Sequence, residues 1–264
     1  MSPPIPVVIR GAAGRMGQAI LRVLEERDDV VLAAALVRAG SAQVDRPVYP
    51  STEVPLRYAE ALAPGVTTGV LVDFSVAEAF DTGLALALER RLAFVSGTTG
   101  LDEPRRAALD RAAGSIPVLW SANFSLGVAV LTRLVRDAAR ALPEWDCEIV
   151  EAHHGRKLDA PSGTALALGR AAAAARGQDF DAVAVLARAG EQAVRREAQI
   201  GFAAVRAGDI VGEHTVLLAT AGERIELVHR ATDRSIFARG AVAAARWIAG
   251  RPPGRYTIED VVFS

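Results

Sequence analysis

Two histidines, an arginine and the only lysine of the chain lie in one short polar stretch, His153-His154-Gly155-Arg156-Lys157. Imidazole titrates near neutral pH, so a histidine here can act as a general acid or base. A lysine ammonium can also release a proton in a suitable environment, whereas an arginine effectively cannot. The stretch predicts proton-transfer chemistry; the alternative is a lysine placed by chance beside histidines that cap or pack.

The same stretch continues into Ser162-Gly163-Thr164, where a helix is expected to begin. Ser162 is a suitable N-cap, and the backbone N–H groups of Gly163 and Thr164 can bind an anion such as a carboxylate. The nearby cations add positive charge, so the pattern predicts a small ligand with one or more carboxylates. In an extended chain His153 and His154 point to opposite sides, which predicts different roles for the two.

A metal site at these histidines is possible but only weakly indicated. No further histidine, cysteine or acid stands at a ligand spacing from the two adjacent histidines. His214 and His229 fall in strand-like segments and are interpreted as structural. The single cysteine, Cys147, excludes an intrachain disulfide and a multi-thiolate metal site, and favours a reducing compartment.

A glycine-rich turn follows the first apolar run. Val7 to Ile9 is typical of a strand, and a helix is expected from Met16 to Glu26. Gly11, Gly14 and Gly17 between them are spaced G-x-x-G-x-x-G. Such glycines allow a tight turn and close approach of a pyrophosphate, while the first N–H groups of the helix bind the phosphates. The turn predicts a dinucleotide site, or otherwise a strand–helix turn without ligand; no Gly-Lys-Ser/Thr follows, so it is not a P-loop.

In proteins that bind NADH, an acidic residue at the end of the second strand hydrogen-bonds the ribose 2′-hydroxyl. Val37 and Arg38 occupy these positions instead. An arginine can pair with a 2′-phosphate, so the sequence favours NADPH over NADH, with use of both left open. The alternative is that Arg38 is a solvent-exposed loop charge.

Strands and helices alternate through the first half of the chain. Further strands are expected at 30–37, 70–74, 92–96 and 117–120, and helices at 77–89 and 102–113. This alternation is typical of parallel strands with right-handed crossovers in a doubly wound sheet. Residues 38–69 give a weaker signal, and we expect a loop there with a short strand or helix.

The second half has a different pattern. Helices are expected at 126–142, 163–176 and 235–249, and strands at 147–152, 200–206, 213–219 and 224–229. The last three strands are spaced as a meander. Together these segments predict a mixed sheet covered by helices on one face.

Composition sets the outer bounds. The chain has 264 residues, is 51% hydrophobic and carries 30 basic against 31 acidic residues, for a net charge of −1. This balance argues against a nucleic-acid binder. No apolar run approaches the roughly 20 residues needed to span a bilayer, and Met1 to Pro6 lack the regions of a signal peptide. We expect a cytoplasmic protein with no membrane partner.

Taken together, these segments resemble the 4-hydroxy-tetrahydrodipicolinate reductase (dihydrodipicolinate reductase) family of lysine and diaminopimelate biosynthesis over nearly the whole chain. Residues 11–17 are similar to the family's amino-terminal fingerprint, and residues 73–75, 96–100 and 122–125 to its cofactor loops. Residues 151–154 with 157–164 are similar to its signature, and residues 206–214 to one further family segment. The signature together with the other motifs, in the right order, is far more specific than any one of them.

The resemblance implies a role for each group of residues. His153 would be the proton donor or acceptor and Lys157 a second proton donor. His154, Gly163 and Thr164 would bind the substrate carboxylates. With Arg38, the cofactor-binding residues would be Gly11, Ala12, Ala13, Gly14, Arg15, Met16, Gly97, Thr98, Thr99, Ser121, Ala122, Asn123 and Phe124.

The implied reaction is hydride transfer from NADPH or NADH to C4 of the unsaturated ring formed as 4-hydroxy-tetrahydrodipicolinate loses water. Protonation at the neighbouring carbon gives tetrahydrodipicolinate. The implied architecture is α/β, with a Rossmann-like doubly wound parallel sheet domain at 1–124 and 234–264. Residues 125–233 would form a smaller α+β substrate-binding and oligomerisation domain with a mixed sheet. The implied assembly is a homotetramer acting on a small dicarboxylate.

Two departures from the family pattern stand out. Many members have an acid where Val37 stands, which leaves the cofactor preference open, and residues 41–69 are shortened relative to longer members. Two alternative functions are another imine or amino-acid dehydrogenase and a non-catalytic NADP-sensing protein. The His-His-Gly-Arg-Lys turn beside a helix start argues against both.

Overall fold

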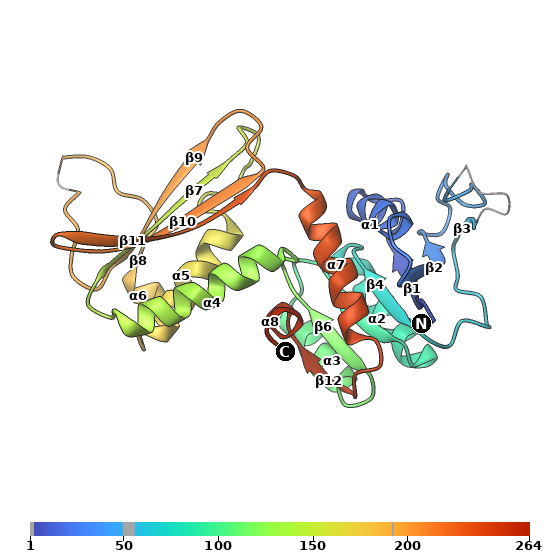
Figure 1. Cartoon of the computed structure of the whole chain (residues 1–264). Helices are drawn as coiled ribbons and strands as arrows, with labels where there is room; N and C mark the ends of the chain where they lie inside the picture. Colours follow the sequence, from blue (N-terminus) through green and yellow to red (C-terminus); the bar gives the residue numbers. More distant parts are fainter. Residues whose placement is uncertain (1–2, 50–55, 192) are drawn as a thin grey trace. The chain divides into compact units, whose positions relative to one another are not determined.

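The computed structural model describes residues 3–49, 56–191 and 193–264, and the chain forms two compact units (Figure 1). Unit 1 is Met1–Leu126 with Ser235–Ser264, and unit 2 is Gly127–Arg234. Two expectations fall partly outside the described residues: the start of the chain at 1–2, and positions 50–55 of the loop expected at 38–69.

Unit 1 is built on a seven-stranded sheet in which every pairing is parallel. The strand order is β12-β6-β5-β4-β1-β2-β3, which is the order of a doubly wound nucleotide-binding sheet. The strands are β1 (Ile5–Arg10), β2 (Val30–Leu36), β3 (Tyr58–Ala59), β4 (Val70–Asp73), β5 (Ala93–Ser96), β6 (Pro117–Trp120) and β12 (Gly254–Tyr256). The predicted parallel α/β fold is confirmed.

Helices cover both faces of this sheet, as its strands require. On β1, Val7 and Ile9 belong to one buried cluster and Val8 to the other, because alternate side chains point to opposite faces. Helices α1 (Arg15–Glu25) and α7 (Ser235–Ile248) pack on the first face. Helices α2 (Phe80–Arg90) and α3 (Glu103–Ala112) pack on the second.

The sequence indicated only one of the smaller elements of unit 1. The 3₁₀ turn η1 (Ala77–Ala79) precedes α2 within the single helix predicted there. Strand β3 lies within residues 38–69, where a short strand or helix is expected from the sequence. After α7, β12 adds an edge strand and α8 (Ile258–Phe263) ends the chain, both unpredicted. Such elements are too short to carry a periodic pattern.

Unit 2 contains a five-stranded mixed sheet of order β11-β10-β7-β9-β8. Its strands are β7 (Asp146–His153), β8 (Ala184–Val185), β9 (Ile200–Arg206), β10 (Gly212–Thr220) and β11 (Glu223–Ala231). Strand β7 pairs antiparallel with β10 and parallel with β9. The mixed sheet predicted for this half of the chain is confirmed.

The predicted meander of the last three strands is wrong in one pairing. β10 and β11 form an antiparallel hairpin, but β7 lies between β9 and β10. The loop from β9 to β10 crosses the end of β7, where Ala207 N–H donates to His153 O and Gly155 N–H donates to Gly208 O. Strand spacing alone did not reveal that an earlier strand separates the two.

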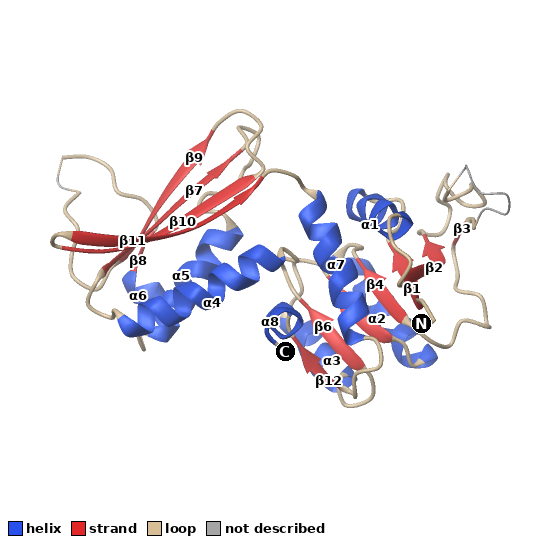
Figure 2. Ribbon diagram, viewed as in Figure 1, coloured by secondary structure: helices blue, strands red, loops and turns tan. Residues whose placement is uncertain are grey.

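The helices of unit 2 pack on one face of its sheet (Figure 2). They are α4 (Leu126–Ala141), α5 (Gly163–Ala175) and the single turn α6 (Phe180–Val183). Leu131 and Val135 of α4 and Leu168 of α5 meet Ile149 and Val216 of the sheet in one buried cluster. Across the described ranges of both units, no helix combines the length and the apolar character that crossing a membrane requires.

Candidate active site

A cleft of about 920 Å³ opens at the carboxyl ends of the strands of unit 1. In a parallel sheet these ends share one edge, so the loops after β1, β2 and β4 meet there. The cleft is lined by Gly11, Ala13 and Gly14 of the glycine turn, by Arg38 after β2, and by the 74–76 loop after β4. Its size lies within the roughly 300–1,000 Å³ typical of small-molecule sites.

The glycine turn has the close packing that its spacing predicts. Gly11 has φ +76°, a conformation that favours glycine. A Cβ on Gly17 would lie 2.4 Å from Gly11 O and 2.6 Å from Ala12 O, so no side chain fits where α1 meets the turn. Ala12 is buried and its N–H donates to Leu36 O, which ties the turn to β2. The residues present fit a dinucleotide whose phosphates approach this backbone.

Arg10, directly before the turn, supports the loop after β4. Its guanidinium donates to Ser75 Oγ at 3.0 Å and forms an ion pair with Asp73 at 3.5 Å. Asp73 is fully buried, and burial raises the pKa of its carboxyl although hydrogen bonds from Ser75 and the charge of Arg10 act against it. Arg10 thus joins the ends of β1 and β4 beneath the cleft.

Two further predicted cofactor loops follow β5 and β6. Gly97 lies against the ring of Phe74, where a Cβ would lie 2.1 Å from Cε1 of the ring. Phe124 belongs to the buried core of unit 1 and Thr98 is also buried, so neither side chain is exposed to a ligand. Trp120 Nε1 donates to Thr98 O at 2.9 Å, which joins the two loops.

Some of the predicted cofactor-binding residues line the cleft, and the others do not. The cleft takes in Gly11, Ala13, Gly14 and Arg38. Ala12 of the glycine turn is buried and does not line the cleft. The other predicted residues lie at the first turn of α1 or in the loops after β5 and β6, outside the cleft's lining: Arg15, Met16, Gly97, Thr98, Thr99, Ser121, Ala122, Asn123 and Phe124.

The acid–base cluster lies in unit 2, at the end of β7. Glu151 and His153 are two residues apart on one strand and therefore share a face. Glu151 Oε2 lies 2.6 Å from His153 Nδ1. Arg206, at the end of β9, donates to both carboxylate oxygens of Glu151 at 2.8 and 2.7 Å, and Ser162 N–H donates at 3.0 Å.

His214 of β10 completes this cluster. Its ring lies edge-on to that of His153 with centroids 5.3 Å apart, and its Nε2 lies 3.0 Å from Ser162 Oγ. Desolvation, then the nearby His153, lowers the pKa of His214 to about 4, so it is neutral at pH 7. Ser162 Oγ also accepts from Ala165 N–H, which confirms the predicted N-cap of α5.

Lys157 already binds a carboxylate in this turn. Its Nζ lies 2.8 Å from Asp159 Oδ1, and this hydrogen bond, with a smaller one from Gly163 N–H, lowers the pKa of Asp159. Desolvation and then nearby cations, first Arg234, hold the pKa of His154 below its ordinary value. The turn is thus electropositive beside the start of α5.

Sequence reasoning missed three residues of this cluster. Glu151 was part of the recognised signature but received no role, although its i, i+2 spacing from His153 already placed both on one face. Arg206 and His214 come from other strands, and no local spacing links them to His153. Within the described part of the chain, no three His, Cys, Asp or Glu side chains are grouped so that they could hold a metal ion.

A doubly wound sheet with a glycine-lined cleft, together with an acid–base cluster beside a cationic turn, defines a nucleotide-dependent oxidoreductase. Two family models, "Dihydrodipicolinate reductase, N-terminus" and "Dihydrodipicolinate reductase, C-terminus", match residues 5–124 and 127–262. The chain belongs to the dihydrodipicolinate reductase family.

Similar proteins agree with this assignment. Proteins named 4-hydroxy-tetrahydrodipicolinate reductase from Xanthomonas campestris pv. campestris and Stenotrophomonas maltophilia are each 49% identical to it, over 98% of both chains. A dipicolinate-bound dihydrodipicolinate reductase from Paenisporosarcina sp. TG-14 has the same fold, with a TM-score of 0.78 at 21% identity, covering 97% of this chain and 99% of that one. None of these relationships supports a non-catalytic sensor.

Proposed function

We propose that this protein reduces 4-hydroxy-tetrahydrodipicolinate to tetrahydrodipicolinate with NADPH or NADH, with loss of water, in lysine and diaminopimelate biosynthesis. The observation that carries this proposal is 49% identity to reductases of that name over 98% of both chains. The glycine-lined cleft and the cluster around His153 agree with it, because they supply a nucleotide site and proton-transfer groups.

The two units divide these tasks. Residues 1–124 and 234–264 form the dinucleotide-binding domain, and 125–233 form the substrate-binding domain. When bound, the nicotinamide cofactor supplies the hydride. The glycine turn, with Arg38 and the loops at 97–99 and 121–124, holds it. Arg38 lines the cleft that the turn opens into, where its charge favours a 2′-phosphate and hence NADPH.

The turn after β7 binds the substrate and moves protons. His153 exchanges a proton with the substrate, and Lys157 is a second proton donor. His154 and the backbone of Gly163 and Thr164 bind the substrate carboxylates. The contact between Lys157 and the Asp159 carboxylate supports this, because the turn already holds an anion of the same kind.

The assembly is a homotetramer formed through the sheet of unit 2. The described helices of this unit all pack on one face, while Val205 and Val228 on the other face are 46% and 42% exposed. Apolar side chains on a sheet surface are suited to burial against other copies. The compartment is the cytoplasm, which suits a chain whose one cysteine, Cys147, is free and buried.

The function is tested by adding freshly generated 4-hydroxy-tetrahydrodipicolinate to the protein and NADPH. We expect substrate-dependent loss of the NADPH absorbance. NADPH binding without any turnover would contradict the proposal and favour a sensor of the cofactor.

A further inference from the structure

The carboxylate of Glu151 is completely buried and saturated with donors. Its side chain is 0% exposed, against 11% for His153 and 19% for Arg206. Arg206 donates one hydrogen bond to each carboxylate oxygen, and Ser162 N–H donates a further one to Oε1. The remaining contact is His153 Nδ1, at 2.6 Å from Oε2.

This arrangement keeps Glu151 ionised. Burial by itself would raise the pKa of Glu151, but the hydrogen bonds from Arg206 and then His153 outweigh it and hold the pKa below its ordinary value. An ionised carboxylate can only accept hydrogen bonds. The contact at Nδ1 of His153 therefore requires the proton to be on Nδ1.

The other ring nitrogen of His153, Nε2, lies beside Gly212. A Cβ at position 212 would lie 3.0 Å from Nε2 and 3.4 Å from Cδ2 of the ring. Across the described residues, Nε2 has no hydrogen-bond partner. The remaining titratable groups around the ring are His214, which is neutral at pH 7, and His154 and Lys157 of the same turn.

We propose that Glu151, held by Arg206, is a positioning residue that fixes the proton on Nδ1 of His153. Nε2 is then the nitrogen that exchanges a proton with the substrate, and Gly212 leaves it accessible. This rests on the proposed function for the chemistry, but the tautomer of His153 follows from the contacts alone. The same device orients histidines in other enzymes, where a buried carboxylate selects the tautomer.

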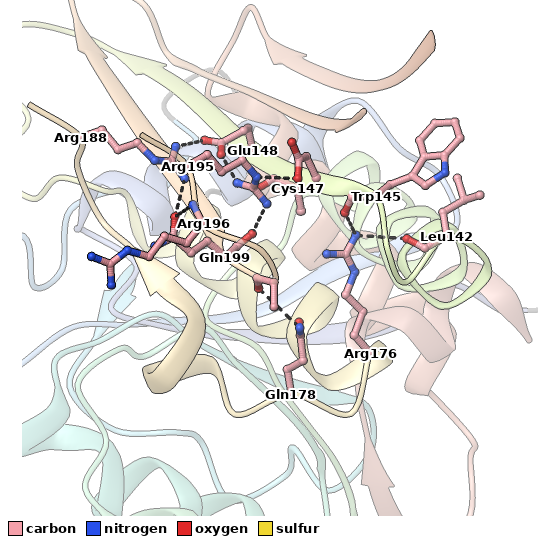
Figure 3. Close-up of polar contacts among 12 residues, drawn as sticks. Leu142, Trp145, Cys147, Glu148, Arg176, Gln178, Arg188, Arg195, Arg196 and Gln199 are labelled. Atoms are coloured by element: carbon pink, nitrogen blue, oxygen red, sulfur yellow. Dashed lines mark hydrogen bonds and ion pairs between the residues drawn. The ribbon is translucent and has the colours of Figure 1, made fainter. Parts of the chain in front are cut away.

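The chain offers a matched control on the same strand. Glu148 lies three residues before Glu151 on β7. Its carboxylate also pairs with two arginines: Arg188 Nη1 lies 2.7 Å from Glu148 Oε2, and Arg195 pairs with Oε1 (Figure 3). It contacts no histidine among the described residues. Glu148→Gln therefore removes a carboxylate from a Glu–Arg cluster of β7 without touching His153.

The test compares Glu151→Gln with Glu148→Gln by steady-state kinetics and by ¹⁵N NMR of the histidine rings, with the His153 signals assigned by their loss in His153→Ala. We expect Glu151→Gln to lower kcat about 10- to 100-fold, the usual cost of losing a group that orients a functional histidine, with little change in KM. The His153 nitrogens should change from the Nδ1-protonated pattern to a mixture of tautomers. Glu148→Gln should leave both readouts as in the wild type.

Gly212→Ala provides a second variant if Glu151→Gln fails to fold. It should lower kcat while His153 keeps the Nδ1-protonated pattern, because only the Nε2 side is obstructed. Wild-type kcat and an unchanged nitrogen pattern in folded Glu151→Gln, or wild-type kcat in Gly212→Ala, would overturn the inference. If the wild type itself does not oxidise NADPH with this substrate, the proposed function fails, and the nitrogen pattern still decides whether Glu151 sets the tautomer.

Discussion

The ammonium of Lys157 pairs with the Asp159 carboxylate at 2.8 Å, yet the lysine side chain remains 21% exposed. It is thus close to solvent and able to exchange an exposed acid for a substrate carboxylate. A fixed positive charge would be enough to bind that carboxylate, and an arginine could supply it. A proton donor must also lose its proton, which arginine effectively cannot do.

Lys157→Arg separates these two roles. The substitution keeps the charge but removes the transferable proton, so we expect kcat to fall at least about 100-fold, as in Lys157→Ala. KM should change less in Lys157→Arg than in Lys157→Ala. The measurement is steady-state turnover of both variants, and a near wild-type kcat for Lys157→Arg would restrict Lys157 to charge alone.

We expect the preference between NADPH and NADH to depend on Arg38. Arg38 is exposed at the rim of the cleft, where it can form charge-assisted hydrogen bonds worth about 1.5–3 kcal/mol with a 2′-phosphate. Arg38→Ala should raise KM for NADPH at least about tenfold and leave KM for NADH nearly unchanged. Arg22→Ala, an exposed arginine of α1 outside the cleft lining, is the control. An equal effect on both cofactors would contradict the assignment.

At the scale of elements, the glycine turn and the cofactor sheet could be predicted because their signals are local. Gly11, Gly14 and Gly17 follow a strand directly, and β1 to α1 matches the expected order within one or two residues. The pairing of β7 with both β9 and β10 could not be predicted, because it depends on contacts between residues about 50 positions apart, as for Glu151 and Arg206. For the same reason, the sequence did not indicate that Arg206 of β9 and His214 of β10 belong to the acid–base cluster.

Gly17→Ala tests whether the turn depends on close packing between strand and helix. The added methyl group would lie 2.4 Å from backbone oxygen, so α1 must shift. Overpacking of this kind costs about 1–3 kcal/mol, and the shift should also weaken NADPH binding. Gly65→Ala, where a Cβ meets nothing within 4 Å, is the control. Urea unfolding and NADPH titration measure the two effects; an unaffected Gly17→Ala would contradict the packing argument.

At the scale of the whole molecule, each unit has its own core and its own chemistry. The sheet of unit 1 is covered by helices on both faces and carries the cleft. Unit 2 carries the buried polar cluster on a sheet covered on one face. The buried His214 of this unit also makes the stability of the fold depend on pH.

Stability should decrease as pH falls from about 6.5 to about 4. His214 has a folded pKa of about 4 against an ordinary 6.5, so the unfolded chain binds its proton more readily in this window. Because a tenfold change in proton affinity is about 1.4 kcal/mol, the loss is about 3 kcal/mol. His214→Asn should flatten the dependence, and His229→Asn, at the paired position on β11, should flatten it less. The measurement is the free energy of unfolding of each protein between about pH 4 and 6.5. The prediction would be contradicted if this free energy depended on pH as steeply in His214→Asn as in the wild type.

Isotope transfer tests the net reduction of 4-hydroxy-tetrahydrodipicolinate most directly. The protein is incubated with this substrate and with NADPH dideuterated at nicotinamide C4, and the product is analysed by mass spectrometry. We expect tetrahydrodipicolinate that carries one deuterium, formed at the same rate as NADPH is oxidised. NADPH consumption without deuterium in this product, or bound NADPH with no product at all, would contradict it.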